Sequence, residues 1–194
     1  MEELCSVLMK ENTGDAYTMR SVICTVYSAI GRASESATMA WDNMSFNTSL
    51  EAPEAEWMEL KTGKSALMSF FVDALSYKMC VIHSLFCYIV ADGANMSYDI
   101  ASSMNLDSLG FVYPAFINKG EGYVARTITA KLKSVAKKGL VPGLTSQHTS
   151  QGLKHRAADD CSHSKCNIVS TVARAGWDYS GQVSKIRDCI IFLY

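Results

Sequence analysis

Residues 15–44 read DAYTMRSVICTVYSAIGRASESATMAWDNM and contain the features that decide the fold. Apolar side chains recur at three- and four-residue spacing through the first half, which predicts an amphipathic helix over Asp15–Ala29 with Asp15 as its N-cap. Gly31 indicates a break after this helix, and a second short helix is expected over Ser34–Trp41. The stretch therefore begins a mainly helical chain.

Outward from this stretch, the pattern predicts one small sheet followed by further helices. Strand edges are expected at Trp41–Phe46 and Trp57–Leu60, around a polar, acidic loop that contains Pro53. A turn at Lys61–Lys64 then leads into a strand over Ala66–Val72. The later expected elements are helices over Ser76–Val90, Val124–Lys138, Thr149–Asp160 (with Ser150 as cap) and Ile168–Arg174, a short buried segment at Gly110–Phe116, and a turn at Gly139–Gly143. These elements predict an α+β, mainly α fold with a small antiparallel sheet.

Composition narrows the class of protein. The chain has 194 residues, 48% hydrophobic content and a formal net charge of −1, which excludes a disordered chain and suits one domain over residues 1–194. Its most apolar stretch, 66–90, is interrupted by charged residues, so no membrane span is expected. Residues 1–100 hold 6 basic and 13 acidic side chains, whereas residues 101–194 hold 12 and 6. This asymmetry keeps a nucleic-acid partner open despite the near-neutral total.

Cysteine usage predicts a reducing intracellular compartment, which would be the nucleus in a eukaryote. The seven cysteines are odd in number, scattered and mostly within apolar runs, and no secretory leader is expected because the first twelve residues are acidic and lack an apolar core. His155, Cys161, His163 and Cys166 are close in sequence, but their spacing matches no standard zinc module. We therefore expect no metal and no cofactor, with a zinc-stabilised domain at Cys161 and Cys166 as a minor alternative.

Four short motifs follow one another along the chain. The first is Gly31-Arg32-Ala33-Ser34-Glu35 with Trp41-Asp42 behind it, and the second is the Lys61-Thr62-Gly63-Lys64 turn. The third is the segment 144–160, above all its last part, SQGLKHRAADD (150–160), and the fourth is Ala173-Arg174-Ala175-Gly176-Trp177-Asp178. In order and approximate spacing, the four resemble the active-site blocks of the tyrosine recombinases, or phage-integrase family, in the form found in Crypton-like mobile elements of eukaryotes.

The resemblance implies a catalytic domain without a separate N-terminal core-binding domain, and it assigns roles to six residues. Arg32 is the first arginine, Lys61 the hairpin lysine and Trp177 the residue at the His/Trp position. Gln151 stands at the histidine position of the His-x-x-Arg helix, and Lys154 at its arginine position. Tyr194 is the candidate nucleophile, although it lies later than the family's usual spacing after Trp177.

The departures from the family pattern predict weakened cleavage. A lysine at 154 keeps a positive charge but loses the bidentate fork of arginine, and a glutamine at 151 cannot shuttle a proton near neutral pH. We therefore expect a domain for DNA breaking and rejoining that binds duplex DNA better than it cuts it. A homo-oligomer on DNA is left open.

Alternatives without catalysis are also open. Arg32 and Glu35 are three residues apart, the spacing of an ordinary surface ion pair. His148, His155 and Arg156 lie close enough to Gln151 and Lys154 for another register of the third motif, although the Leu-x-x-x-Ala-Ala frame favours Lys154. The second function class is a DNA-binding or protein-interaction relic of a mobile element.

Overall fold

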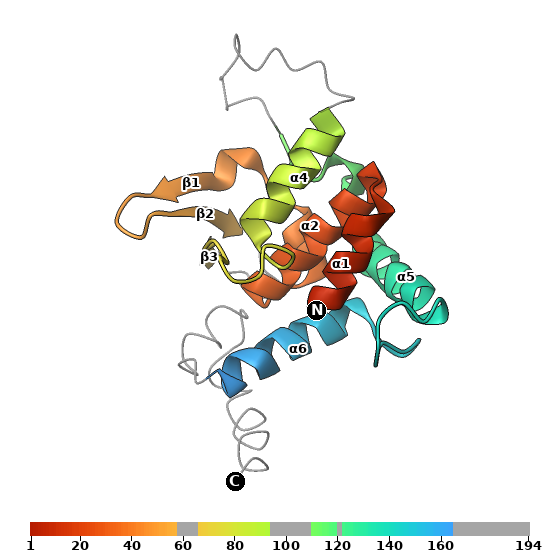
Figure 1. The fold of residues 1–194 in the computed structure, drawn as a ribbon. Coiled ribbons are helices and arrows are strands. Elements are labelled where there is room, and N and C mark those ends of the chain that lie inside the picture. The colour runs from red at the N-terminus through yellow and green to blue at the C-terminus, as the bar shows by residue number, and fades with distance from the viewer. Residues whose placement is uncertain (58–65, 94–109, 120–121, 165–194) are drawn as a thin grey trace.

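The structure, a computed structural model, describes residues 1–57, 66–93, 110–119 and 122–164. Helices dominate this part of the chain, and one three-stranded sheet lies beside them (Figure 1). The elements are α1 (Glu2–Glu11), α2 (Gly14–Ala29), α3 (Ala33–Ala37), β1 (Met44–Asn47), β2 (Ala52–Trp57), β3 (Ala66–Ser69), α4 (Val81–Gly93), α5 (Tyr123–Lys137) and α6 (Ser150–His163), with 3₁₀ turns at Trp41–Asn43 and Pro114–Phe116. The expected mainly helical α+β class is confirmed.

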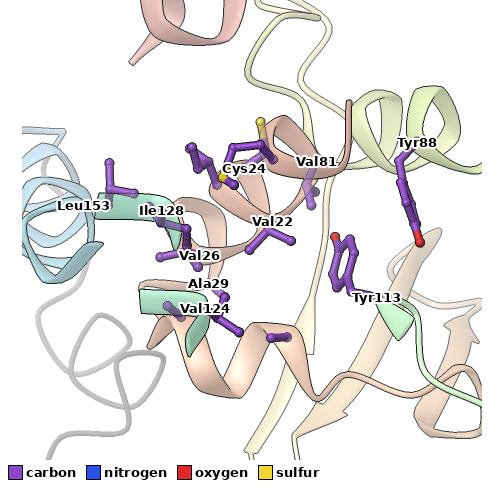
Figure 2. Close-up of a cluster of buried hydrophobic side chains, with 14 of the residues drawn as sticks. Val22, Cys24, Val26, Ala29, Val81, Tyr88, Tyr113, Val124, Ile128 and Leu153 are labelled. Atoms are coloured by element: carbon purple, nitrogen blue, oxygen red, sulfur yellow. The ribbon is translucent and has the colours of Figure 1, made fainter. Parts of the chain in front are cut away.

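Helix α2 is the central element, because it packs against α1, α3, α4 and α6. Figure 2 shows Val22, Val26 and Ala29 of this helix among buried side chains from α4, α5 and α6. The predicted helix over Asp15–Ala29 is confirmed, but its N-cap is Thr13, whose hydroxyl accepts a hydrogen bond from the Ala16 N–H at 3.2 Å. The prediction of Asp15 as the cap was wrong.

Polar side chains of α2 form hydrogen bonds with two segments that are distant in the sequence. Ser21 and Thr25 hydrogen-bond the Tyr113 hydroxyl at 2.8 and 3.1 Å, and burial raises the pKa of Tyr113 to about 12. Arg20 is fully buried and donates to the carbonyl oxygens of Lys78 and Tyr77 at 3.0 and 2.8 Å. The hydrogen bonds of this arginine therefore fix the loop that precedes α4.

The sheet is antiparallel in the order β1-β2-β3, and the β1–β2 hairpin extends away from the helices (Figure 1). Its existence confirms the predicted sheet, but the expected loop around Pro53 is wrong. Pro53 pairs with Phe46 near the start of β2, before the β2–β3 register begins, so its missing N–H removes no bond to β3. Its carbonyl oxygen still accepts from the Phe70 N–H at 2.8 Å.

Several helices and strands begin or end at other residues than the sequence predicts. The short second helix ends at Ala37, and Trp41 belongs to a 3₁₀ turn rather than to a strand. β3 ends at Ser69. Helix α4 begins at Val81 because Asp73 and the Ser76 carbonyl hold the preceding residues in turns.

The later helices follow their predicted pattern closely. Helix α5 buries Val124, Ile128, Leu132 and Val135, which recur at the three- and four-residue spacing of one helix face. Helix α6 is capped by Thr149 rather than Ser150, since the Thr149 hydroxyl accepts from the Gly152 N–H at 3.3 Å. The expected helix Ile168–Arg174 lies outside the described residues.

Helix α1 was not predicted from the sequence, where the first residues were considered only as a possible secretory leader. Leu4, Cys5 and Leu8 of this helix are buried against the core, so its apolar face is short but complete. In the part of the chain that the structure describes, no helix has the length and apolar character needed to cross a membrane.

Candidate functional site

Arg32 stands at the junction between two helices. Helix α2 ends with Ile30 in the left-handed conformation, and Arg32 then adopts an extended conformation as the N-cap of α3. The carboxylate of Glu35 accepts from both the backbone N–H and the Nη1 of Arg32, each at 2.7 Å. The ion pair expected from their spacing is therefore present, and the Arg32 side chain remains 34% exposed.

Lys154 lies on the buried face of α6. Leu153 and Ala157 belong to the same face, and only 5% of Lys154 is exposed. Helix α6 packs against both α2 and α5, so its neighbours fix the position of this lysine. A lysine with so little exposure is uncommon, because burial removes the ammonium group from water.

The charges of Arg32 and Glu35 both act on Lys154. Burial lowers the pKa of Lys154 to about 8, the Arg32 cation acts in the same direction, and Glu35 opposes both. The first and third motifs, which come from opposite halves of the chain, therefore meet in the fold. Their three charged groups carry a net positive charge when Lys154 is protonated.

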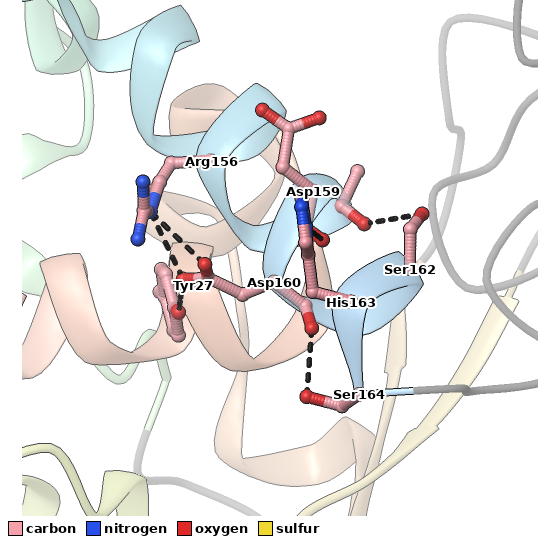
Figure 3. A network of polar contacts seen from close by, with 8 residues as sticks. Tyr27, Arg156, Asp159, Asp160, Ser162, His163 and Ser164 are labelled. Atoms are coloured by element: carbon pink, nitrogen blue, oxygen red, sulfur yellow. Dashed lines mark hydrogen bonds and ion pairs between the residues drawn. The ribbon is translucent and has the colours of Figure 1, made fainter. Parts of the chain in front are cut away.

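The other polar side chains of the third motif face elsewhere. Gln151 and His155 are exposed, and Arg156 is 68% exposed while its Nε pairs with Asp160 at 3.0 Å. The Tyr27 hydroxyl donates to the same carboxylate, as Figure 3 shows. The residue of the third motif on which the Arg32 charge acts is therefore Lys154, whereas Arg156 belongs to a contact between α2 and α6.

Three of the six site residues, Lys61, Trp177 and Tyr194, lie outside the described residues. Of the remaining three, Arg32 and Lys154 are close enough for the charge of one to act on the other, and Gln151 is exposed on the first turn of α6. The roles that the resemblance assigns to all six residues stay predictions.

One residue joins this site that the motifs did not assign to it, and a second positions the helix that carries Lys154. Glu35 was visible within the first motif, and its spacing from Arg32 was the available signal. Thr129 of α5 accepts a hydrogen bond from the Ser150 N–H at 3.1 Å and so positions the start of α6. No local sequence pattern predicts this contact, because Thr129 and Ser150 are brought together only by the packing of α5 against α6.

Metal binding finds no support in the described part of the chain, where no three His, Cys, Asp or Glu side chains gather as potential ligands. Cys166, one member of the alternative zinc site, lies outside it. No family model, curated protein or solved structure matches this chain. The geometry of the site is therefore the basis for a functional proposal.

Proposed function

We propose that this chain is a DNA-binding domain of the tyrosine-recombinase type, in which Arg32 and Lys154 bind one backbone phosphate. The observation that supports this most is the meeting of these two cations from separate motifs. Perturbed, buried charges of this kind are more frequent at functional sites than elsewhere. A phosphodiester is the ligand whose charge and geometry suit the pair.

The local charge balance favours an anionic ligand. The Arg32 cation disfavours the charged form of Lys154 and Glu35 favours it, so a phosphate, as a further anion, would stabilise the protonated ammonium. Glu35 occupies Nη1 of Arg32, but a guanidinium has five N–H donors in a planar fork. A phosphate oxygen at this site would accept from Arg32 and neutralise the charge of Lys154.

The chemistry of strand breaking follows from the resemblance. A tyrosine oxygen attacks the phosphorus, a 3′-phosphotyrosyl bond forms, and the bond to the 5′ oxygen breaks. The resemblance assigns the attack to Tyr194 and protonation of the departing oxygen to Lys61. Arg32 and Lys154 would stabilise the charge that grows on the non-bridging oxygens. Lys154 lacks the arginine fork and Gln151 cannot transfer a proton. We therefore propose that the domain binds duplex DNA but cleaves it inefficiently.

DNA binding is the first test. Fluorescence anisotropy with a labelled duplex at low salt would compare the wild type with Lys154→Met, which removes the charge but suits a buried position. Lys78→Met is the control, because Lys78 pairs with Glu2 outside the site. We expect the Lys154 variant to bind about tenfold more weakly and the control to bind like the wild type. Absence of duplex binding by the wild type would overturn the proposal.

Strand cleavage is the second test and separates the enzyme from the non-catalytic relic. A nicked suicide duplex traps a covalent protein–DNA adduct when the nucleophile attacks. An adduct that disappears in Tyr194→Phe would support a breaking and rejoining enzyme. Salt-sensitive DNA binding without any adduct would favour the relic, whose specific support is the presence of Gln151 and Lys154 at the two catalytic positions.

A further inference from the structure

A shallow hollow of about 350 Å³ lies along the outer face of α5. Two cationic side chains, one hydroxyl and two methyl groups line it. The lining residues are Ala125, Arg126, Thr129, Ala130 and Lys133. None of them belongs to the six residues assigned by the motifs, so the hollow is a separate feature.

The charged side chains that α5 contributes to this face are both cationic. The helix buries its apolar side chains on one face and contains no aspartate or glutamate between Tyr123 and Lys137. Arg126 and Lys133 are seven residues apart, so they project from the same face two turns from each other. Lys131, by contrast, is directed to the Glu11 carboxylate of α1. No described residue forms an ion pair with Lys133.

The dimensions of the hollow suit a nucleic-acid backbone. Seven residues of helix advance about 10 Å along the axis, which is close to the axial rise of three nucleotides in one strand of duplex DNA. The small side chains of Ala125 and Ala130 allow a backbone to approach the helix closely. Two cations at this spacing can therefore contact phosphates of one strand.

Thr129 adds a hydrogen-bond donor to the hollow. Its oxygen accepts from the Ser150 N–H, and its own proton has no acceptor among the residues that the structure describes. The same contact brings the N-terminus of α6 to this part of α5, and that helix end carries partial positive charge. Thr129 and the helix end thus add to the attraction of an anion by Arg126 and Lys133.

We propose that this hollow binds backbone phosphates of duplex DNA flanking the phosphate at Arg32 and Lys154. The inference rests on the proposed function and gives it a second contact surface. Helix α5 packs against both α3 and α6, the helices that carry Arg32 and Lys154 or lie directly beside them. The lining includes no aromatic side chain on which bases could stack, so the hollow fits a duplex backbone rather than an unpaired strand.

Salt dependence of DNA affinity measures these contacts directly. Anisotropy titrations of a labelled duplex at several salt concentrations would compare the wild type with Arg126→Ala and Lys133→Ala. Each variant is expected to reduce the slope of log affinity against log salt by about 0.9, the value for one lost phosphate contact. Lys131→Ala is the matched control on the same helix, and its slope should equal that of the wild type.

The outcomes separate this inference from the proposed function. Duplex binding that weakens in Lys154→Met but keeps its salt slope in Arg126→Ala and Lys133→Ala would overturn the α5 surface alone. Failure of the wild type to bind any duplex would overturn both. Equal competition by an unpaired strand would overturn the preference for a duplex. Lys133 is exposed, so circular dichroism of Lys133→Ala should match the wild type and keep the comparison valid.

Discussion

Gly31 fits against the Trp57 indole because it has no side chain. A Cβ built at this position would lie 2.2 Å from Cη2 and 2.4 Å from Cζ3 of the ring, which is buried in the core. The glycine of the first motif therefore has a packing role in addition to breaking α2. Because Arg32 is the next residue, the packing of Gly31 against Trp57 also restricts where the Arg32 backbone lies.

We predict that Gly31→Ala lowers the free energy of unfolding by about 1–3 kcal/mol, because the added methyl group forces the indole or the backbone to move. Urea denaturation would measure the change. Gly14→Ala is the matched control, since nothing lies within 4 Å of a Cβ at the first residue of α2. A stability loss of equal size in both variants would contradict the role assigned to Trp57.

Ile30, the residue before Gly31, has an unusual backbone conformation. Its φ of 53° is in the left-handed region, which a β-branched residue rarely adopts. The side chain is buried with Ala157 and Ala158 of α6. Its burial offsets the strain and connects the end of α2 to the helix that carries Lys154.

At the scale of elements, a polar contact also connects α2 to α6. The Tyr27 hydroxyl donates to the Asp160 carboxylate, which Arg156 also pairs with (Figure 3). Burial and the neighbouring carboxylate raise the pKa of Tyr27 above its usual range, so the hydroxyl stays protonated and remains a donor. The contact orients α6 on the same side as Ile30.

We predict that Tyr27→Phe destabilises the protein by about 1 kcal/mol, the usual net contribution of one partly buried hydrogen bond. Thermal or urea unfolding would measure it. Tyr17→Phe is the control on the same helix, because the Tyr17 hydroxyl donates to Asn12 at an exposed position. Equal destabilisation by the two variants would show that the α2–α6 contact contributes nothing specific.

At the scale of the whole molecule, the two halves of opposite charge meet at the Arg32–Lys154 site. The acidic half contributes one of its few basic residues, Arg32, and the basic half contributes Lys154. The near-neutral total therefore conceals a local positive site. The positive charge of this site depends on pH, because burial and the Arg32 cation lower the pKa of Lys154 to about 8.

We predict that duplex affinity decreases as pH rises from 7 to 9. The protonated ammonium attracts phosphate, and its charge is lost as the pH passes the pKa of Lys154, which lies below the ordinary lysine value. In Lys154→Arg the affinity should change little over this range, since a guanidinium stays charged. Anisotropy titrations at each pH would measure both proteins. A parallel decrease in the arginine variant would assign the effect to another group.

Local pattern was enough to predict the central helix, the later helices α5 and α6, and the class of the fold. Such periodicity is a property of neighbouring residues, since each buried face repeats with the turn of the helix. Local pattern predicted helix ends less reliably. The N-caps of α2 and α6 are Thr13 and Thr149, whereas the sequence predicted Asp15 and Ser150. There, adjacent polar residues compete for the same orphan N–H groups.

The sequence by itself determined the central helix α2, the later helices α5 and α6, the presence of a small sheet and the placement of Arg32 and Lys154 in charged motifs. Only the tertiary structure decided that Lys154 is buried within reach of the Arg32 charge, and that Arg156 instead pairs with Asp160. Pro53 in β2 and the Thr129 contact to α6 were decided in the same way. The physical reason is that these positions depend on pairing and packing between segments distant in the chain, which no local spacing encodes.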